Sequence, residues 1–128
     1  MDRPKVNFEH GSSNFNTPVN VGGTNVILTP AQIFRGLLRS APEENNTITL
    51  TLPSAADLIS AFPKVIPSGF CWRFSVRNDG KSLITIEPGK GGSVDGYNTV
   101  PVSQYAMKFV LRFSSVTSSA EAYQLISE

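Results

Sequence analysis

The side chains best suited to catalysis are few and widely spaced. His10 is the only histidine and Cys71 the only cysteine among the 128 residues. A Ser-His-Asp or Cys-His arrangement would have to use His10, which lies in a segment without hydrophobic periodicity, whereas catalytic groups need rigid placement. Cys71 stands between Phe70 and Trp72 in an apolar stretch, and we interpret it as a buried structural thiol.

The carboxylates are scattered in the same way. The ten Asp and Glu residues stand mostly at expected caps and turns, such as Asp57 at a helix start and Asp79 in a turn. None stands inside an apolar stretch where burial would raise the pKa of a general acid. The residues Gly89–Ser93 lack the spacing and the following helix of a phosphate-binding loop. We therefore expect no enzyme, no metal site and no cofactor.

Cationic side chains form a pattern that favours binding over catalysis. Arg73 and Arg77 alternate with the apolar residues of one expected strand, and Lys108 and Arg112 do the same in another. Alternation places each pair on the sheet face opposite the Phe and Trp side chains. Two interpretations remain open: solvated or subunit-contact charge, or a patch that meets an anionic group on a receptor or glycan.

A glycine-rich loop from Gly89 to Gly96 is the second candidate for contact, because exposed loops on a rigid scaffold often carry recognition. Tyr97 and Tyr105 have rings that stack well on sugars, although such residues are also common for packing alone. The candidate receptor-contact residues are Lys90, Ser93, Asp95 and Tyr97 in or beside this loop, together with Arg73 and Arg77.

Two short helices are expected. Thr29 is placed as an N-cap, with Pro30 at the first helical position and Gln32 closing a capping box. Apolar residues at helical spacing extend this helix through Leu38, and Pro42 ends it. The second helix begins after Ser54, with Asp57 expected to reciprocate the cap, and stops at Pro63.

The remaining body alternates in hydrophobicity and predicts strands. The run Thr47–Leu52 places aliphatic side chains on one face and threonines on the other. Further strands are expected at 70–77, at 83–87 returning antiparallel after an Asn78–Gly80 turn, near 100–102, at 108–113 and at 123–126. This order predicts a mainly all-β fold: an antiparallel β-sandwich, jelly-roll-like, with the two helices at its edge or end.

Length, charge and composition limit the possible partners. The chain suits one domain, with residues 1–25 as an extended shaft or anchor segment and residues 26–128 as the head. The formal net charge of +1 gives no reason to expect nucleic acid. No apolar run suits a membrane span, and no secretory signal stands at the N-terminus. With one cysteine, production in a reducing host cytoplasm is expected.

The order of motifs along the chain is more specific. Ile27-Leu28-Thr29 leads into a helix, followed by a Thr-rich strand ending in Leu52-Pro53-Ser54-Ala55, then Pro67–Phe70, Phe74–Asn78 and Ile84–Gly89. Thr99-Val100-Pro101 and a Tyr-bearing strand close it. This order resembles the C-terminal head domains of spike, fibre and collagen-like surface proteins from large DNA viruses, virophages and some phages. Within this group the chain resembles virophage spike proteins, and the resemblance covers about residues 27–127.

The resemblance implies a jelly-roll-like homotrimer at the virion surface that attaches to a host cell or to a giant virus through a receptor, with a glycan as one option. It assigns no contact residue position by position. A capsid decoration or trimerisation module with a purely structural role is the alternative. A glycan hydrolase on a spike is less favoured, because no carboxylate stands inside an apolar stretch, although two facing carboxylates in a cleft would revive it. A cytokine-like ligand is less favoured because the sequence shows no signal peptide.

Overall fold

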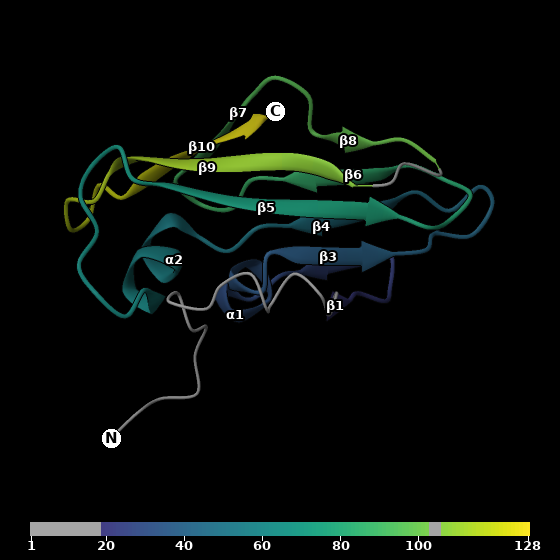
Figure 1. Cartoon of the computed structure of the whole chain (residues 1–128), viewed down its shortest axis with the longest axis horizontal. Helices are drawn as coiled ribbons and strands as arrows, with labels where there is room; N and C mark the ends of the chain where they lie inside the picture. Colours follow the sequence, from purple (N-terminus) through teal and green to yellow (C-terminus); the bar gives the residue numbers. More distant parts are fainter. Residues whose placement is uncertain (1–18, 103–105) are drawn as a thin grey trace.

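The fold is mainly β, with two mixed sheets and two short helices among the described residues (Figure 1). It is seen in a computed structural model, which describes residues 19–102 and 106–128. The six-stranded sheet contains, in spatial order, β1 (Val19–Asn20), β3 (Leu37–Ser40), β5 (Cys71–Asn78), β9 (Met107–Ser115), β10 (Ala122–Ser127) and β7 (Gly92–Asp95). The four-stranded sheet contains β2 (Asn25–Ile27), β4 (Ile48–Thr51), β6 (Ile84–Glu87) and β8 (Thr99–Val100). The helices are α1 (Pro30–Phe34) and α2 (Ala55–Ala61).

The first six strands alternate between the two sheets along the chain. β1, β3 and β5 pair in parallel in one sheet, and β2, β4 and β6 pair in parallel in the other. The chain therefore winds three times, and each turn contributes one strand to each sheet. β8 and β9 then add antiparallel to β6 and β5.

The observed strand directions correct the expected antiparallel arrangement. Five of the eight described strand pairings are parallel and three are antiparallel. Parallel neighbours need long crossover connections, and the winding supplies them by passing through the opposite sheet before each return. The mainly β prediction is confirmed, and the two helices are present.

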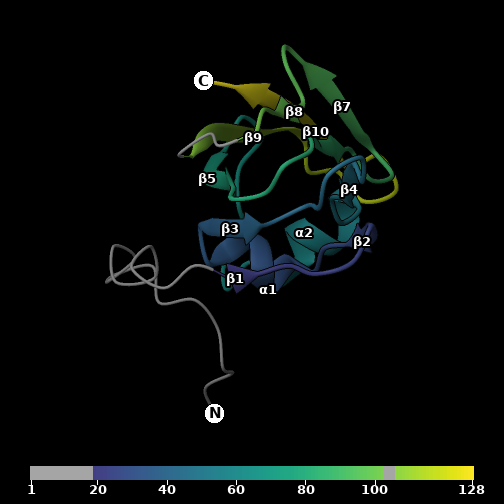
Figure 2. The same ribbon diagram turned by 90° about the vertical axis from the view of Figure 1, so that its right-hand side faces the viewer.

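The two helices occupy equivalent places in successive turns of the winding. α1 lies between β2 and β3, and α2 lies between β4 and β5, so both carry the chain from the four-stranded to the six-stranded sheet. They contact each other and lie toward one end of the long axis in Figure 1. Figure 2 looks along that axis and shows α2 between β3 of one sheet and β2 of the other. This position, at the end of the sheets, agrees with the prediction.

The start of α1 is confirmed and its predicted length is wrong. Thr29 and Gln32 form the expected capping box: the Gln32 amide donates to Oγ1 of Thr29 at 3.3 Å and the Thr29 amide donates to Oε1 of Gln32 at 2.8 Å. The helix stops at Phe34, because Gly36 has a φ of +90° and turns the chain. Leu38, expected in the helix, lies in β3 and pairs with Val76 of β5.

The second helix follows its predicted bounds, although only the Ser54 half of the expected reciprocal cap is present. Oγ of Ser54 accepts a hydrogen bond from the Asp57 amide at 3.1 Å, and the helix ends before Pro63. Ala55 and Leu58 are fully buried, which fixes the apolar face of the helix against the core. Cap and periodicity are local signals, so the sequence located this helix without tertiary information.

The strand after the Asn78–Gly80 turn does not return beside β5, which corrects the predicted hairpin. β6 lies in the other sheet, parallel to β4. The turn is held by the loop between β3 and β4: the Asp79 amide donates to the Ser40 carbonyl at 2.9 Å and the Lys81 amide to the Pro42 carbonyl at 2.6 Å. A Cβ on Gly80 would stand 2.3 Å from backbone atoms of Pro42, so only glycine permits this approach.

The glycine-rich segment is partly a strand. Gly92–Asp95 forms β7, which pairs in parallel with β10 at the edge of the six-stranded sheet. A Cβ on Gly92 would lie 2.5 Å from the Tyr123 ring, so the glycine lets the backbone rest on that ring. The expected outward loop is therefore limited to the turns on either side of β7.

The end of the expected N-terminal segment belongs to the folded body. β1 forms one edge of the six-stranded sheet, and Val21 is buried in the core with its carbonyl accepting from Oγ of Ser40 at 2.9 Å. Residues 1–18, including His10, lie outside the described residues.

One hydrophobic core draws side chains from both sheets and both helices. At the helical end, Phe62 contacts four other rings of the described residues, with centroid distances of 4.5 Å to Phe34, 5.3 Å to Phe70, 5.9 Å to Trp72 and 5.7 Å to Phe113. Phe74 and Phe109 stack at 5.6 Å across the paired strands β5 and β9. Because the inward face of β5 is fixed in this way, its alternate residues must point outward.

Candidate functional site

The outer face of the six-stranded sheet carries a group of cationic side chains. On β5, Arg73 and Arg77 are exposed while the intervening Phe74 and Val76 are buried. On β9, Lys108 stands opposite Ser75 and Arg112 opposite Cys71. We call the basic face the set Arg39, Arg73, Arg77, Lys108 and Arg112. β5 and β9 are paired neighbours, which brings the cations of the two expected strands onto one surface.

Arg39 is a member of the basic face that the sequence analysis missed. It was expected near the end of a helix, whereas it lies in β3 directly opposite Arg77. The only sequence signal for this was Gly36, which ends α1 early enough for Arg39 to enter a strand.

Carboxylates neutralise part of the basic face. Asp79 contacts two guanidinium groups, at 3.3 Å to Nε of Arg39 and 2.7 Å to Nε of Arg77. Glu128 approaches Nε of Arg73 at 3.5 Å, in a pair that is largely exposed to solvent. Arg112 donates to the neutral amide oxygen of Gln124 at 3.3 Å and so keeps its full charge. Exposed ion pairs of this kind contribute little stability, so an incoming anion competes with them easily.

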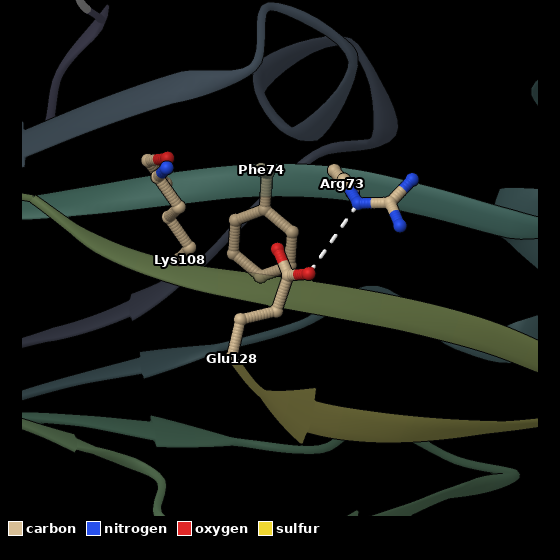
Figure 3. A pocket seen from close by; sticks show the side chains of 5 residues that line it. Arg73, Phe74, Lys108 and Glu128 are labelled. Carbon is tan, nitrogen blue, oxygen red and sulfur yellow. Dashed lines mark hydrogen bonds and ion pairs between the residues drawn. The ribbon is translucent and has the colours of Figure 1, made fainter.

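A shallow, open depression of about 600 Å³ lies between β5, β9 and the end of β10. It is lined by Arg73, Phe74, Ser75, Lys108 and Glu128 (Figure 3). The Phe74 side chain is buried in the core, so the accessible chemistry comes from the other residues. Lys108 is exposed and has no ion-pair partner among the described residues. The depression therefore offers one free ammonium, one loosely paired guanidinium and a hydroxyl.

The structure separates the predicted contact residues into two groups. Arg73 and Arg77 belong to the basic face, whereas Ser93 and Asp95 lie on β7. β9 and β10 stand between β5 and β7, a separation of about 14 Å for three strand spacings. In the strand register Asp95 nevertheless occupies the same row and face as Arg73.

Lys90 and Tyr97 lie in the turns on either side of β7. The Lys90 carbonyl accepts from the Ala55 amide at 2.9 Å, which places this turn beside α2. Tyr97 has 76% of its surface exposed, and Oγ of Ser127 accepts from its amide at 3.1 Å. Lys90 and Tyr97 thus do not join the basic face. Tyr105 lies outside the described residues.

The remaining reactive groups have structural explanations or are isolated. Burial raises the pKa of Tyr123 to about 12, because its phenol lies in the core. Its hydroxyl accepts from the Gly89 amide at 2.8 Å and donates to the Pro53 carbonyl at 3.0 Å. Cys71 is exposed, which corrects the expected burial: it belongs to the outward set of β5, and its thiol contacts the Gly69 carbonyl at 3.5 Å.

No group of three or more His, Cys, Asp or Glu residues that could hold a metal ion occurs in the described part of the chain. Within the same residues, no helix is long and apolar enough to cross a membrane. Comparison with family models, curated proteins and solved structures finds no match for this chain. The site is therefore interpreted from its own geometry: a solvent-open, mainly cationic surface on a rigid sheet.

Proposed function

We propose that this chain is a non-enzymatic, two-sheet β head of a virion spike or fibre, made in the host cytoplasm. It acts as a homotrimer that attaches to a host cell or giant-virus surface. The basic face is the contact surface, and its ligand is an anionic glycan on the receptor. The observation that carries the proposal is the concentration of five cationic side chains on one sheet face. The motif order that resembles spike heads supports the same role.

The charge distribution supports an anionic ligand. The whole chain has a net charge of +1. The basic face has five cationic side chains, and two carboxylates, Asp79 and Glu128, form ion pairs with them. The net charge of this region is therefore about +3. A sulfate or sialic-acid carboxylate gains charge-assisted hydrogen bonds there, and arginine forks suit such oxyanions.

Weak individual contacts fit an attachment function in a multivalent assembly. The ligand-facing side chains are exposed, so each ion pair contributes about 0.2–1 kcal/mol. Several copies bound to one surface raise the overall avidity by about 10²–10⁴ without a new contact, provided that the sites engage together. A trimeric head supplies this multiplicity.

The test compares two charge reversals. Lys108→Glu places a carboxylate in the depression, and Lys64→Glu makes the same charge change in an exposed position after α2. We expect Lys108→Glu to weaken binding to a sulfated oligosaccharide at least about tenfold, because it removes one attraction and adds a repulsion. Lys64→Glu should bind like the wild type. Calorimetry at two salt concentrations gives the affinities and their screening by salt.

Two results would overturn the basic face as the ligand site. One is equal loss of binding in the two variants, which would show a non-specific charge effect. The other is a wild-type protein that binds neither anionic oligosaccharides nor host or virion surfaces. That second result would favour the alternative of a purely structural decoration or trimerisation module. The specific observation in favour of this alternative is the nearly uncharged outer face of the four-stranded sheet, where Glu87 is the one charged residue of the described strands.

A further inference from the structure

The outer face of the four-stranded sheet is nearly uncharged, in contrast to the basic face. One row across its four strands consists of Asn25, Thr49, Thr85 and Thr99, which are mutual register partners. The next row consists of Ile27, Thr51 and Glu87. We call these seven residues the threonine face. The core-facing residues that alternate with them include Leu50, Ile84, Ile86 and Val100, which are completely buried.

Charge is nearly absent from the threonine face. Glu87, at one end of β6, is its only charged residue. Ile27, on the edge strand β2, has 77% of its surface exposed. Leu83 precedes β6 by one residue, continues the ladder by accepting from the Ile48 amide at 3.1 Å, and is also exposed. A sheet face that only meets water normally carries more charged side chains than this one.

We propose that the threonine face is the surface through which copies of this chain associate. This inference rests on the homo-oligomer in the proposed function and names its contact surface. Copies of one chain carry identical charges, so two basic faces repel each other at close range. A neutral face meets a second copy without that repulsion. Centres of protein interfaces are depleted of charged residues, as this face is.

The chemistry of the face suits a second copy better than a charged or strongly apolar partner. Each threonine offers a methyl group for contact and a hydroxyl that both donates and accepts a hydrogen bond. Identical faces are therefore complementary to one another, because each supplies donors and acceptors of the same kind. Ile27 and Leu83 at the margin add the apolar area that threonines lack.

Size sets the expected strength of the contact. Four strands span about 14 Å between the outermost strand axes, and two rows add about 7 Å along the strands. This footprint is well below the roughly 800 Å² per partner of a standard stable interface. A single face-to-face contact is thus weak, and a contact of standard size must extend beyond the seven residues, over Leu83 and the edge strand β2. A closed assembly strengthens it, because each copy then engages more than one neighbour.

The test is the solution mass of the full chain, measured by light scattering over a range of concentrations. We expect the wild type to exceed its chain mass of 13.8 kDa. Thr49→Lys and, separately, Thr85→Lys should shift the mass to that of the single chain, because each places an ammonium at the centre of the contact. Ser114→Lys is the matched control: Ser114 is exposed on β9 of the other sheet, and the variant should keep the wild-type mass.

Circular dichroism of each variant confirms that it remains folded, and two independent lysine variants guard against one that does not. Thr49→Val keeps the shape of the side chain, and we expect it to remain associated. If the wild type is monomeric at every concentration, both the homo-oligomer and its contact surface are wrong. If the wild type is oligomeric and folded Thr49→Lys and Thr85→Lys keep its mass, the oligomer stands and the threonine face is not its interface.

Discussion

Replacing Tyr123 with phenylalanine removes a single oxygen atom from the core and leaves the ring in place. Tyr123 is 1% exposed, and its hydroxyl joins two segments that are far apart in sequence. It donates to the buried Pro53 carbonyl ahead of α2 and accepts from the half-buried Gly89 amide after β6. The substitution therefore deletes two hydrogen bonds and creates no cavity larger than the missing atom.

The expected loss of stability follows from how deeply the two hydrogen-bond partners of the hydroxyl are buried. The buried Pro53 carbonyl loses its side-chain donor and bears most of the desolvation penalty, about 1–3 kcal/mol. The Gly89 amide is closer to solvent, so losing its hydrogen bond costs the usual net value of about 1 kcal/mol. We expect Tyr123→Phe to lower the free energy of unfolding by about 2–3 kcal/mol in urea denaturation at neutral pH. Tyr97→Phe, at an exposed position, is the matched control and should change it by less than about 0.5 kcal/mol.

The pH dependence gives a second, independent check on the same hydroxyl. The pKa of Tyr123 is raised from 10.0 to about 12 in the folded protein. Between these values the unfolded chain loses the phenol proton before the folded chain does, so the stabilising contribution of the neutral phenol is complete below pH 10 and is lost as pH rises toward 12. The stability gap between wild type and Tyr123→Phe should narrow there by about 1.4 kcal/mol per pH unit.

A gap that stays constant from pH 9 to 12 would refute the raised pKa of Tyr123 in the folded protein. A stability loss below about 0.5 kcal/mol at neutral pH would refute the two hydrogen bonds as stabilising contacts. Both measurements compare the same pair of proteins, which differ only at Tyr123, so contributions common to the two proteins cancel in the difference.

Two further substitutions test how the sheets are held together. Asn78→Ala should lower the free energy of unfolding by about 3–4 kcal/mol in chemical denaturation, because fully buried Asn78 makes three hydrogen bonds. Its amide donates to the Ser82 carbonyl at 2.8 Å and the Val100 carbonyl at 3.0 Å, and its oxygen accepts from the Gly80 amide at 2.9 Å. A loss of stability below about 1 kcal/mol would show that water replaces these bonds. Phe62→Ala should cost about 3–5 kcal/mol by removing the ring at the centre of the aromatic cluster, measured by calorimetric melting; a smaller loss would mean that the neighbouring rings close the space.

Local signals in the sequence located several elements correctly. The capping box of Thr29 and Gln32 fixed the start of α1, and Ser54 with Pro63 bounded α2. The alternation of Thr47–Leu52 predicted β4 with its threonines outward. These features depend on neighbours within a few residues, where capping geometry and side-chain period are set by the chain itself.

The same local signals did not predict which strands pair. An Asn-Asp-Gly turn after β5 is typical of a hairpin, yet the turn is bonded to the β3–β4 loop and directs β6 into the other sheet. The decisive contact is the approach of Gly80 to Pro42, almost forty residues earlier in the chain. Gly92 against the Tyr123 ring is a second case, and it converts an expected loop into β7.

The two candidate surfaces also combine features that the sequence predicts with features that only the tertiary structure shows. The sequence by itself determined that Arg73, Arg77, Lys108 and Arg112 point away from the core, because alternation in a strand fixes the face of each side chain. Only the tertiary structure added Arg39 and the neutralising Glu128, and it separated β7 from them. It also aligned threonines of three different strands into one row. The physical reason is that period is a property of one segment, whereas register and strand order depend on which distant segments pack together.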